Sequence, residues 1–197
     1  PLADRWGDQV RNLTGWESSG LPAQKSFFDR YVKEYPGKNQ KIFVIISDAF
    51  RYEAAVEFTK RLQKENRWTA EIEGVLGCLP SFTQLGMASL LPGGKLTIAP
   101  DTGEVELDGR STKGTENRRT ILGLSGYKAT ALQSEEFMEL NTKTEGRALM
   151  RDHDVIYIYH NAIDKTGDSV MTEGGTFEAV EKTFAELELI IKKVANI

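Results

Sequence analysis

The sequence predicts an α/β domain, in which a mostly parallel β-sheet is flanked by helices. Residues 41–48 and 154–160 each contain an apolar run rich in β-branched and aromatic side chains, which is typical of strands covered on both faces. Amphipathic stretches with helical spacing precede, separate and follow these two runs. Strands that alternate with helices favour a parallel sheet.

The bulk composition excludes several classes of protein. The 197 residues are enough for one domain with a core, and the formal net charge is −4 with both signs interspersed. This charge does not favour a general nucleic-acid or membrane surface, and the apolar runs are too short to span a bilayer. The single cysteine excludes an intrachain disulfide and is typical of a reducing compartment, so we expect a cytoplasmic protein.

The N-terminal part of the chain contains a lead-in segment, the first strand and two helices. Residues 1–24 are mixed in character and interrupted by glycine and proline, so we treat them as a lead-in from an upstream region, with the domain spanning residues 25–197. An apolar stripe predicts a helix at residues 27–35, which a Pro-Gly pair ends. Inward-facing apolar positions after the first strand predict a helix at residues 51–66.

The remaining elements are expected from periodicity and from turn residues. Residues 69–77 alternate loosely between apolar and polar side chains, which predicts a strand. A stretch rich in Gly, Asp and Thr at residues 95–113 predicts a small hairpin. Further helices are expected at residues 84–91, 115–124, 134–150 and 175–195.

The first candidate for chemistry is Asp48, which directly follows a predicted strand. Ligands in open α/β sheets bind outside the carboxyl ends of the strands, so a carboxylate there is placed to hold a divalent ion. Arg51, which follows Asp48 closely, is placed to meet a phosphate group. The alternative is that Asp48 caps the following helix, and the sequence alone leaves both interpretations open.

The second candidate is the pair of hydroxyl residues at the start of the predicted helix 84–91. A serine or threonine hydroxyl at such a position can act as a nucleophile when a metal or a base activates it. The alternative, which the spacing alone favours, is that Ser81 or Thr83 caps the helix.

The third candidate is the polar segment that follows the second buried strand. His160, Asp164 and Asp168 provide three potential metal ligands within nine residues. Imidazole together with carboxylates suits zinc, manganese or similar ions. The alternative is a solvated polar turn around Gly167.

Five stretches of the sequence form a set of motifs, at residues 46–53, 79–87, 90–92, 105–109 and 157–168. Taken together in this order, they resemble the PglZ domain, a branch of the alkaline phosphatase superfamily. The resemblance extends over roughly residues 40–185. It is specific because three separate motifs agree with the family both in their order along the chain and in the residues they contain. PglZ proteins are associated with BREX-type phage defence in bacteria and archaea.

The resemblance implies an alkaline-phosphatase-like sheet and a metal-dependent hydrolase of phosphate esters. Asp48 matches the strand-end ligand of one metal, and Thr83 matches the nucleophile that contacts this metal. Asp164 and Asp168 match the pair that holds a second metal. The second member of this pair is histidine in many relatives; with aspartate there, zinc is the first expectation and manganese or magnesium become more competitive.

The resemblance also bears on the rest of the site and on partners. Independently of the resemblance, we expect Arg51 to neutralise a phosphate oxygen. His160 and Asn161 have no firm counterpart in the superfamily, and we expect them to shape the site. The expected substrate is a phosphate ester, with nucleic acid and oligonucleotides included. Phosphodiesters are favoured because PglZ domains fused to response regulators resemble phosphodiesterases. The expected protein partners are other components of the defence system.

One departure from the superfamily pattern affects the expected activity. The superfamily site is completed by a later Asp-His-Gly turn, and this sequence contains none. We therefore expect a portion of the domain that is incomplete at its C-terminal end and inactive by itself. The alternative function is a catalytically inactive, phosphatase-like scaffold that binds protein partners in the defence complex.

Two other α/β folds account for less of the sequence. A receiver-like domain would be phosphorylated on Asp48, but no acidic pair lies upstream of it, and residues 160–168 would have no linked role. A dinucleotide-binding domain would require a glycine fingerprint, which this sequence lacks.

Overall fold

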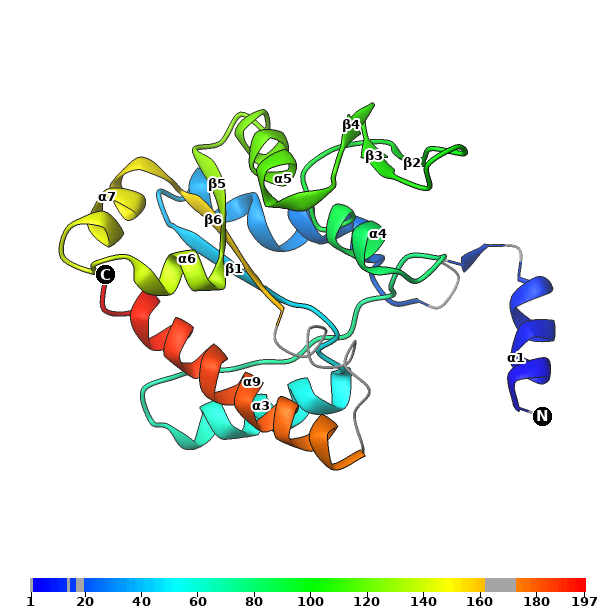
Figure 1. The fold of residues 1–197 in the computed structure, drawn as a ribbon, viewed down its shortest axis with the longest axis horizontal. Coiled ribbons are helices and arrows are strands. Elements are labelled where there is room, and N and C mark those ends of the chain that lie inside the picture. The colour runs from blue at the N-terminus through cyan, green and yellow to red at the C-terminus, as the bar shows by residue number, and fades with distance from the viewer. Residues whose placement is uncertain (1, 14, 17–19, 162–172) are drawn as a thin grey trace.

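The structure is a computed structural model, and it describes residues 2–13, 15–16, 20–161 and 173–197. At its centre is a parallel sheet of three strands in the order β1–β6–β5. Helices cover both faces of this sheet, which gives three layers (Figure 1). The predicted α/β class, with a parallel sheet between helices, is therefore confirmed. The three strands are β1 (Ile42–Ser47), β5 (Ala129–Gln133) and β6 (Val155–His160).

The two strands predicted from their apolar runs both form, but they differ in burial. In the central strand β6, all six residues are buried. In β1, which lies at the edge of the sheet, Val44 alone is buried and the other five residues are half-buried. Side chains of β1 pack in the core clusters on both faces of the sheet, as expected, but β1 is less completely buried than β6 because an edge strand has a neighbouring strand on one side only.

Two further expectations about strands are corrected by the structure. Strand β5 was not among the predicted strands, since its sequence Ala-Thr-Ala-Leu-Gln has no run of large apolar residues. Residues 69–77 were expected to form a strand, yet within the described chain they form one isolated bridge, between Leu76 and Ala23. This segment lies against the preceding helical region instead, where the Arg30 guanidinium is 2.8 Å from the Glu73 carboxylate.

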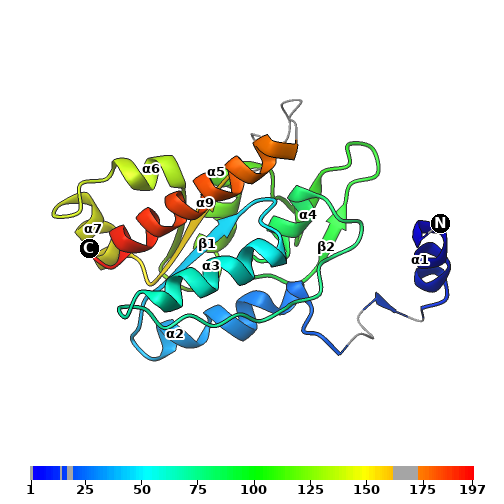
Figure 2. The ribbon, with the colours of Figure 1, turned by 90° about the horizontal axis from the view of Figure 1, so that it is seen from below.

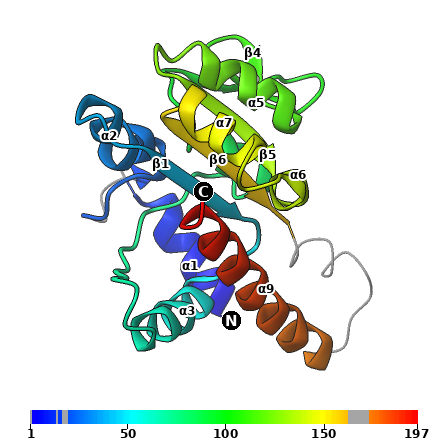
Figure 3. The same cartoon turned by 90° about the vertical axis from the view of Figure 1, so that its left-hand side faces the viewer.

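One face of the sheet is covered by α3 (Tyr52–Lys64) and α9 (Glu173–Val194), which run side by side (Figures 2 and 3). The rings of Phe58 and Phe184 stack between these helices, with centroids 5.5 Å apart. Both helices were predicted, at residues 51–66 and 175–195, and are confirmed. The buried residues at this face are Leu132, Phe137, Ile156, Ile158, Leu187 and Ile190.

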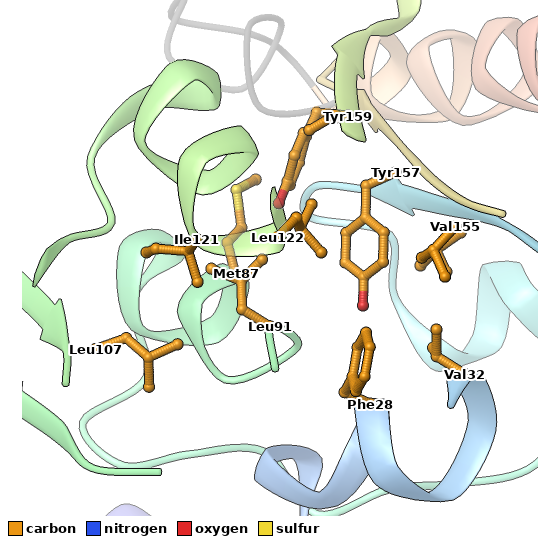
Figure 4. Close-up of a cluster of buried hydrophobic side chains, with 12 residues drawn as sticks. Phe28, Val32, Met87, Leu91, Leu107, Ile121, Leu122, Val155, Tyr157 and Tyr159 are labelled. Atoms are coloured by element: carbon orange, nitrogen blue, oxygen red, sulfur yellow. The ribbon is translucent and has the colours of Figure 1, made fainter. Parts of the chain in front are cut away.

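The opposite face is covered by a helical region at residues 24–37, by α4 (Thr83–Ala88) and by α5 (Gly114–Gly123). Tyr157 and Tyr159 point from β6 into this layer (Figure 4), and the Tyr157 hydroxyl donates to the Leu90 carbonyl oxygen at 2.7 Å. The helical region comprises the 3₁₀ turn η2 (Gln24–Ser26), the π-helical turn η3 (Phe28–Val32) and α2 (Glu34–Gly37).

The predicted helix at residues 134–150 forms as two helices, α6 (Ser134–Glu139) and α7 (Glu145–Asp152). Between them, the Glu145 carboxylate accepts a hydrogen bond from the Asn141 backbone N–H at 2.8 Å. Asn and Thr side chains compete with helical backbone bonds, which accounts for the break.

The predicted hairpin forms from β2 (Leu96–Ile98), β3 (Val105–Leu107) and β4 (Arg110–Ser111). Its turn holds Asp108 and Gly109 at φ values of 51° and 76°. The Asp108 carboxylate accepts hydrogen bonds from the backbone N–H groups of Lys95 and Gly94, and these bonds lower its pKa.

Helix α1 (Leu2–Arg11) lies apart from the three layers and has no buried residue (Figures 1 and 2). The division into a lead-in at residues 1–24 and a domain from residue 25 stays a prediction. Within the described residues, we find no helix with the length and apolar character needed to cross a bilayer.

Candidate active site

The carboxyl ends of β1 and β6 meet at one edge of the sheet, where two of the predicted site residues come together. Ser47 lies opposite His160 in the parallel register. The ladder continues one residue further, because the Asp48 N–H donates to the His160 carbonyl oxygen at 2.9 Å. The structure thus places the half-buried Asp48 where the sequence predicted it, at the carboxyl edge of the sheet.

The alternation of strand side chains indicates the face on which each residue lies. Val44 and Ile46 pack in the core cluster that also contains Met87 of α4. Asp48 is two residues beyond Ile46, so it belongs to the same face of the sheet, which α4 covers. Ser47 and His160 belong to the opposite face, which α9 covers.

The backbone after Asp48 is strained. Ala49 has a φ of 56°, which places a non-glycine residue in the left-handed region. The Asp48 Oδ1 atom accepts a hydrogen bond from the Ala49 N–H at 2.9 Å within this bend. A left-handed alanine costs roughly 1–2 kcal/mol, and such strain is concentrated at functional sites.

The capping alternatives do not agree with the structure. The N-cap residue of α3 is Arg51, and that of α4 is Phe82; neither helix has a side-chain cap bond. Asp48 therefore does not cap α3, and neither Ser81 nor Thr83 caps α4. Thr83 is instead the first residue of α4, and its side chain is exposed.

Arg51 is exposed as well, and among the described residues no hydrogen bond joins it to Thr83. Behind Thr83, the Gln84 side-chain amide donates to the Thr112 hydroxyl at 3.3 Å. This contact ties the start of α4 to the hairpin.

His160 is held on both of its ring nitrogens. Its Nδ1 atom lies 3.0 Å from the Ser47 hydroxyl, and its Nε2 atom lies 2.8 Å from the Glu186 carboxylate on α9. The His160 side chain is only 3% exposed. Because both nitrogens are engaged, His160 could ligate a metal only by giving up one of these bonds, which favours its assignment as a site-shaping residue.

The contact partner Glu186 was not among the residues predicted from the sequence. It lies 26 residues beyond His160 and is four residues from Lys182, whose ammonium group is 3.7 Å away. This spacing is typical of a solvent-exposed helical pair. Its contact with His160 depends on how α9 packs on the sheet, and a local pattern cannot reveal that.

Arg118 of α5 is a second buried polar group that the sequence did not indicate. Its Nε atom donates to the Thr112 carbonyl oxygen at 3.0 Å, and its guanidinium lies 4.7 Å from the centroid of the Tyr159 ring. Burial raises the pKa of Tyr159 to about 12, although Arg118 acts in the opposite direction. Arg118 thus links α5, the hairpin and β6 behind the sheet edge.

The donor set for a metal is described only in part. Asn161 is half-buried at the start of the segment that leaves β6. Asp164 and Asp168 lie outside the described residues. In the part of the chain that the structure describes, no group of three His, Cys, Asp or Glu residues could hold a metal ion. Of the three carboxylates predicted to hold metal, Asp48 is the one that lies within the described residues.

Comparison with known proteins identifies the family. The family model of the BREX system PglZ alkaline phosphatase-like domain matches residues 27–197. The chain is 45% identical over 201 residues to the alkaline phosphatase-like protein BrxZ of Escherichia coli O9:H4 (strain HS). It is 36% identical over 197 residues to the alkaline phosphatase-like protein PglZ of Bacillus cereus (strain H3081.97).

Each alignment covers 99% of this chain but 23% of the relative. No solved structure matches the chain. The family match spans most of the chain and includes β1, α4 and β6, which carry Asp48, Thr83 and His160. The chain therefore belongs to the BREX system PglZ alkaline phosphatase-like family.

Proposed function

We propose that the protein is a metal-dependent hydrolase of phosphate esters, with phosphodiesters as the favoured substrates. The observation that carries this proposal is Asp48, held at the carboxyl edge of the parallel sheet and followed by the strained Ala49. Ligands of open α/β sheets bind at this edge. A carboxylate there, in a member of an alkaline phosphatase-like family, is best accounted for as a metal ligand.

The proposed metal site holds two ions, and its ligands come from the end of β1, the start of α4 and the segment that follows β6 in the sequence. Asp48 and Thr83 would hold one divalent ion, and Asp164 and Asp168 the other. Zinc is the first choice, and manganese or magnesium are competitive because the three carboxylates are hard oxygen donors. When bound, such ions would supply positive charge that stabilises an in-line displacement at phosphorus and lowers the pKa of the threonine hydroxyl.

The proposed reaction has two steps. The Thr83 oxygen forms a bond to phosphorus and loses its proton to solvent, while the bond from phosphorus to the leaving alcohol breaks and that alcohol takes up a proton. Water then cleaves the threonine ester and releases the phosphate product. Arg51 would pair with a non-bridging phosphate oxygen, since a guanidinium matches the geometry of phosphate.

The proposed biological setting follows from the family. We place the protein in the cytoplasm of a bacterial or archaeal cell, as a component of phage defence together with other proteins of that system. Nucleic acid or an oligonucleotide is one substrate class with the required phosphodiester bond.

A second candidate is a phosphatase-like scaffold that binds protein partners and does not turn over substrate. It is favoured if the rest of the full-length protein also lacks the Asp-His-Gly turn of the superfamily, which this sequence does not contain. The two candidates differ in metal binding and in turnover.

Replacing Asp48 by asparagine tests the proposed site without an activity assay. Because the change removes a charged oxygen ligand, we expect the affinity for Mn²⁺ or Zn²⁺, measured by calorimetry on the full-length protein, to fall by more than about 100-fold. Asp101→Asn is the matched control, because Asp101 is an exposed turn residue outside the site. Equal metal affinities of the wild-type protein and Asp48→Asn would contradict the proposal.

A further inference from the structure

We infer that Glu186 is a positioning residue, which fixes Asp48 through His160 and Ser47. This inference rests on the proposed function, because Asp48 is the residue being positioned. Ser47, His160 and Glu186 come from β1, β6 and α9, so the contacts join the edge strand, the central strand and a helix.

The geometry leaves little freedom in this chain of contacts. The two side-chain distances, 3.0 Å from Ser47 Oγ to His160 Nδ1 and 2.8 Å from His160 Nε2 to Glu186 Oε2, are those of direct hydrogen bonds. Because the imidazole is buried, water cannot readily replace either partner, and a ring nitrogen left without one would carry a desolvation penalty.

The carboxylate determines where the imidazole carries its proton. An ionised carboxylate only accepts hydrogen bonds, so Glu186 requires a hydrogen on Nε2. In the neutral imidazole, Nδ1 is then an acceptor, and the Ser47 hydroxyl donates to it. Glu186 thereby fixes the tautomer and the ring orientation of His160, and His160 in turn fixes the Ser47 side chain.

The same histidine also holds the next residue of the chain. Its carbonyl oxygen accepts the hydrogen bond from the Asp48 N–H at 2.9 Å. Asp48 is thus attached to His160 in two ways, through its own N–H and through the neighbouring Ser47 side chain. Groups that hydrogen-bond directly to a metal ligand contribute about 10–100-fold to metal affinity. Glu186 acts on Asp48 through two further residues, so its contribution is expected at or below the lower end of this range.

The competing interpretation is a purely structural bond between α9 and the sheet. The Lys182 ammonium group does not account for the position of Glu186, because it is 3.7 Å from the other carboxylate oxygen, Oε1, and its side chain is 71% exposed. A structural bond would change stability alone. A positioning residue also changes the affinity of the site for metal in protein that remains folded.

The test compares the Mn²⁺ affinities of variants of the full-length protein. We expect Glu186→Ala to weaken Mn²⁺ binding by up to about 10-fold at a temperature where the variant is folded. Glu186→Gln, whose amide oxygen can still accept from Nε2, should restore most of this loss. The matched control is Glu188→Ala, on the same helix, because its carboxylate pairs with Lys192 at 3.4 Å and does not contact His160.

A second variant tests the route of the effect. If Glu186 acts through His160 and Ser47, then Ser47→Ala and Glu186→Ala together should weaken Mn²⁺ binding less than the product of their separate effects. Full additivity of the two changes in binding free energy would overturn this route.

Failure of the inference and failure of the proposed function are distinguishable. If Asp48→Asn loses Mn²⁺ while folded Glu186→Ala binds it as wild type does, the inference is wrong and the proposed site stands. If the wild-type protein binds neither Mn²⁺ nor Zn²⁺, the proposed function and the inference both fail.

Discussion

Replacing Thr83 by alanine is expected to lower the turnover of a chromogenic phosphodiester by at least about 10³-fold, because the variant lacks the attacking oxygen. The exposed position of Thr83 at the start of α4 leaves its hydroxyl accessible to a substrate. The change removes one proposed ligand but leaves the Asp48 carboxylate in place. Because a neutral hydroxyl is a weaker ligand than a carboxylate, Mn²⁺ affinity should fall much less than in Asp48→Asn. Steady-state kinetics and calorimetry on the full-length protein measure the two quantities.

Two control variants sharpen this experiment. Thr83→Ser retains a hydroxyl and should retain measurable turnover. Ser81→Ala removes a hydroxyl that is also exposed, two residues earlier, and should have little effect. Undiminished turnover in Thr83→Ala would contradict the assignment of Thr83 as the nucleophile.

Replacing Phe137 by alanine is expected to have the largest effect on stability, a loss of about 3–5 kcal/mol in the free energy of unfolding. Phe137 of α6 is fully buried in the cluster that packs α9 against the sheet. Its ring centroid lies 6.1 Å from that of Phe43 on β1, and the Lys193 ammonium of α9 lies 5.5 Å from it. Truncation would leave a cavity where these three elements meet.

Chemical denaturation of the two proteins measures this loss. Met138→Ala is the matched control, because Met138 is the next residue of the same helix and is 38% exposed. Its substitution should cost much less than that of Phe137. A change of less than about 1 kcal/mol for Phe137→Ala would show that α6 does not contribute to the core as the structure indicates.

The sequence predicted those strands whose pattern of apolar residues corresponds to their burial in the folded chain. The β6 strand has an unbroken run of large β-branched and aromatic residues because both its faces are covered. The β5 strand lies at the other edge of the sheet and pairs with β6 alone, and its small residues do not form the run of large apolar side chains that indicates a buried strand. Residues 69–77 alternate as a strand does, yet the described chain provides no neighbouring strand along their length.

The same distinction applies to the candidate site. Asp48 was predictable because one carboxylate directly follows a strand-like run. The roles of Glu186 and Arg118 were not, because each depends on packing between elements that are distant in sequence. The incomplete burial of β1 was not predictable, because the apolar run does not reveal whether a strand lies at the edge of its sheet.

The most direct test of the central claim is to remove divalent ions from the full-length protein with a chelator and then measure turnover of a chromogenic phosphodiester. The account predicts that turnover is lost and returns when Zn²⁺ or Mn²⁺ is added to wild-type protein, but not to Asp48→Asn. Absence of turnover with Zn²⁺, Mn²⁺ and Mg²⁺ in a folded wild-type protein would contradict it and favour the scaffold function.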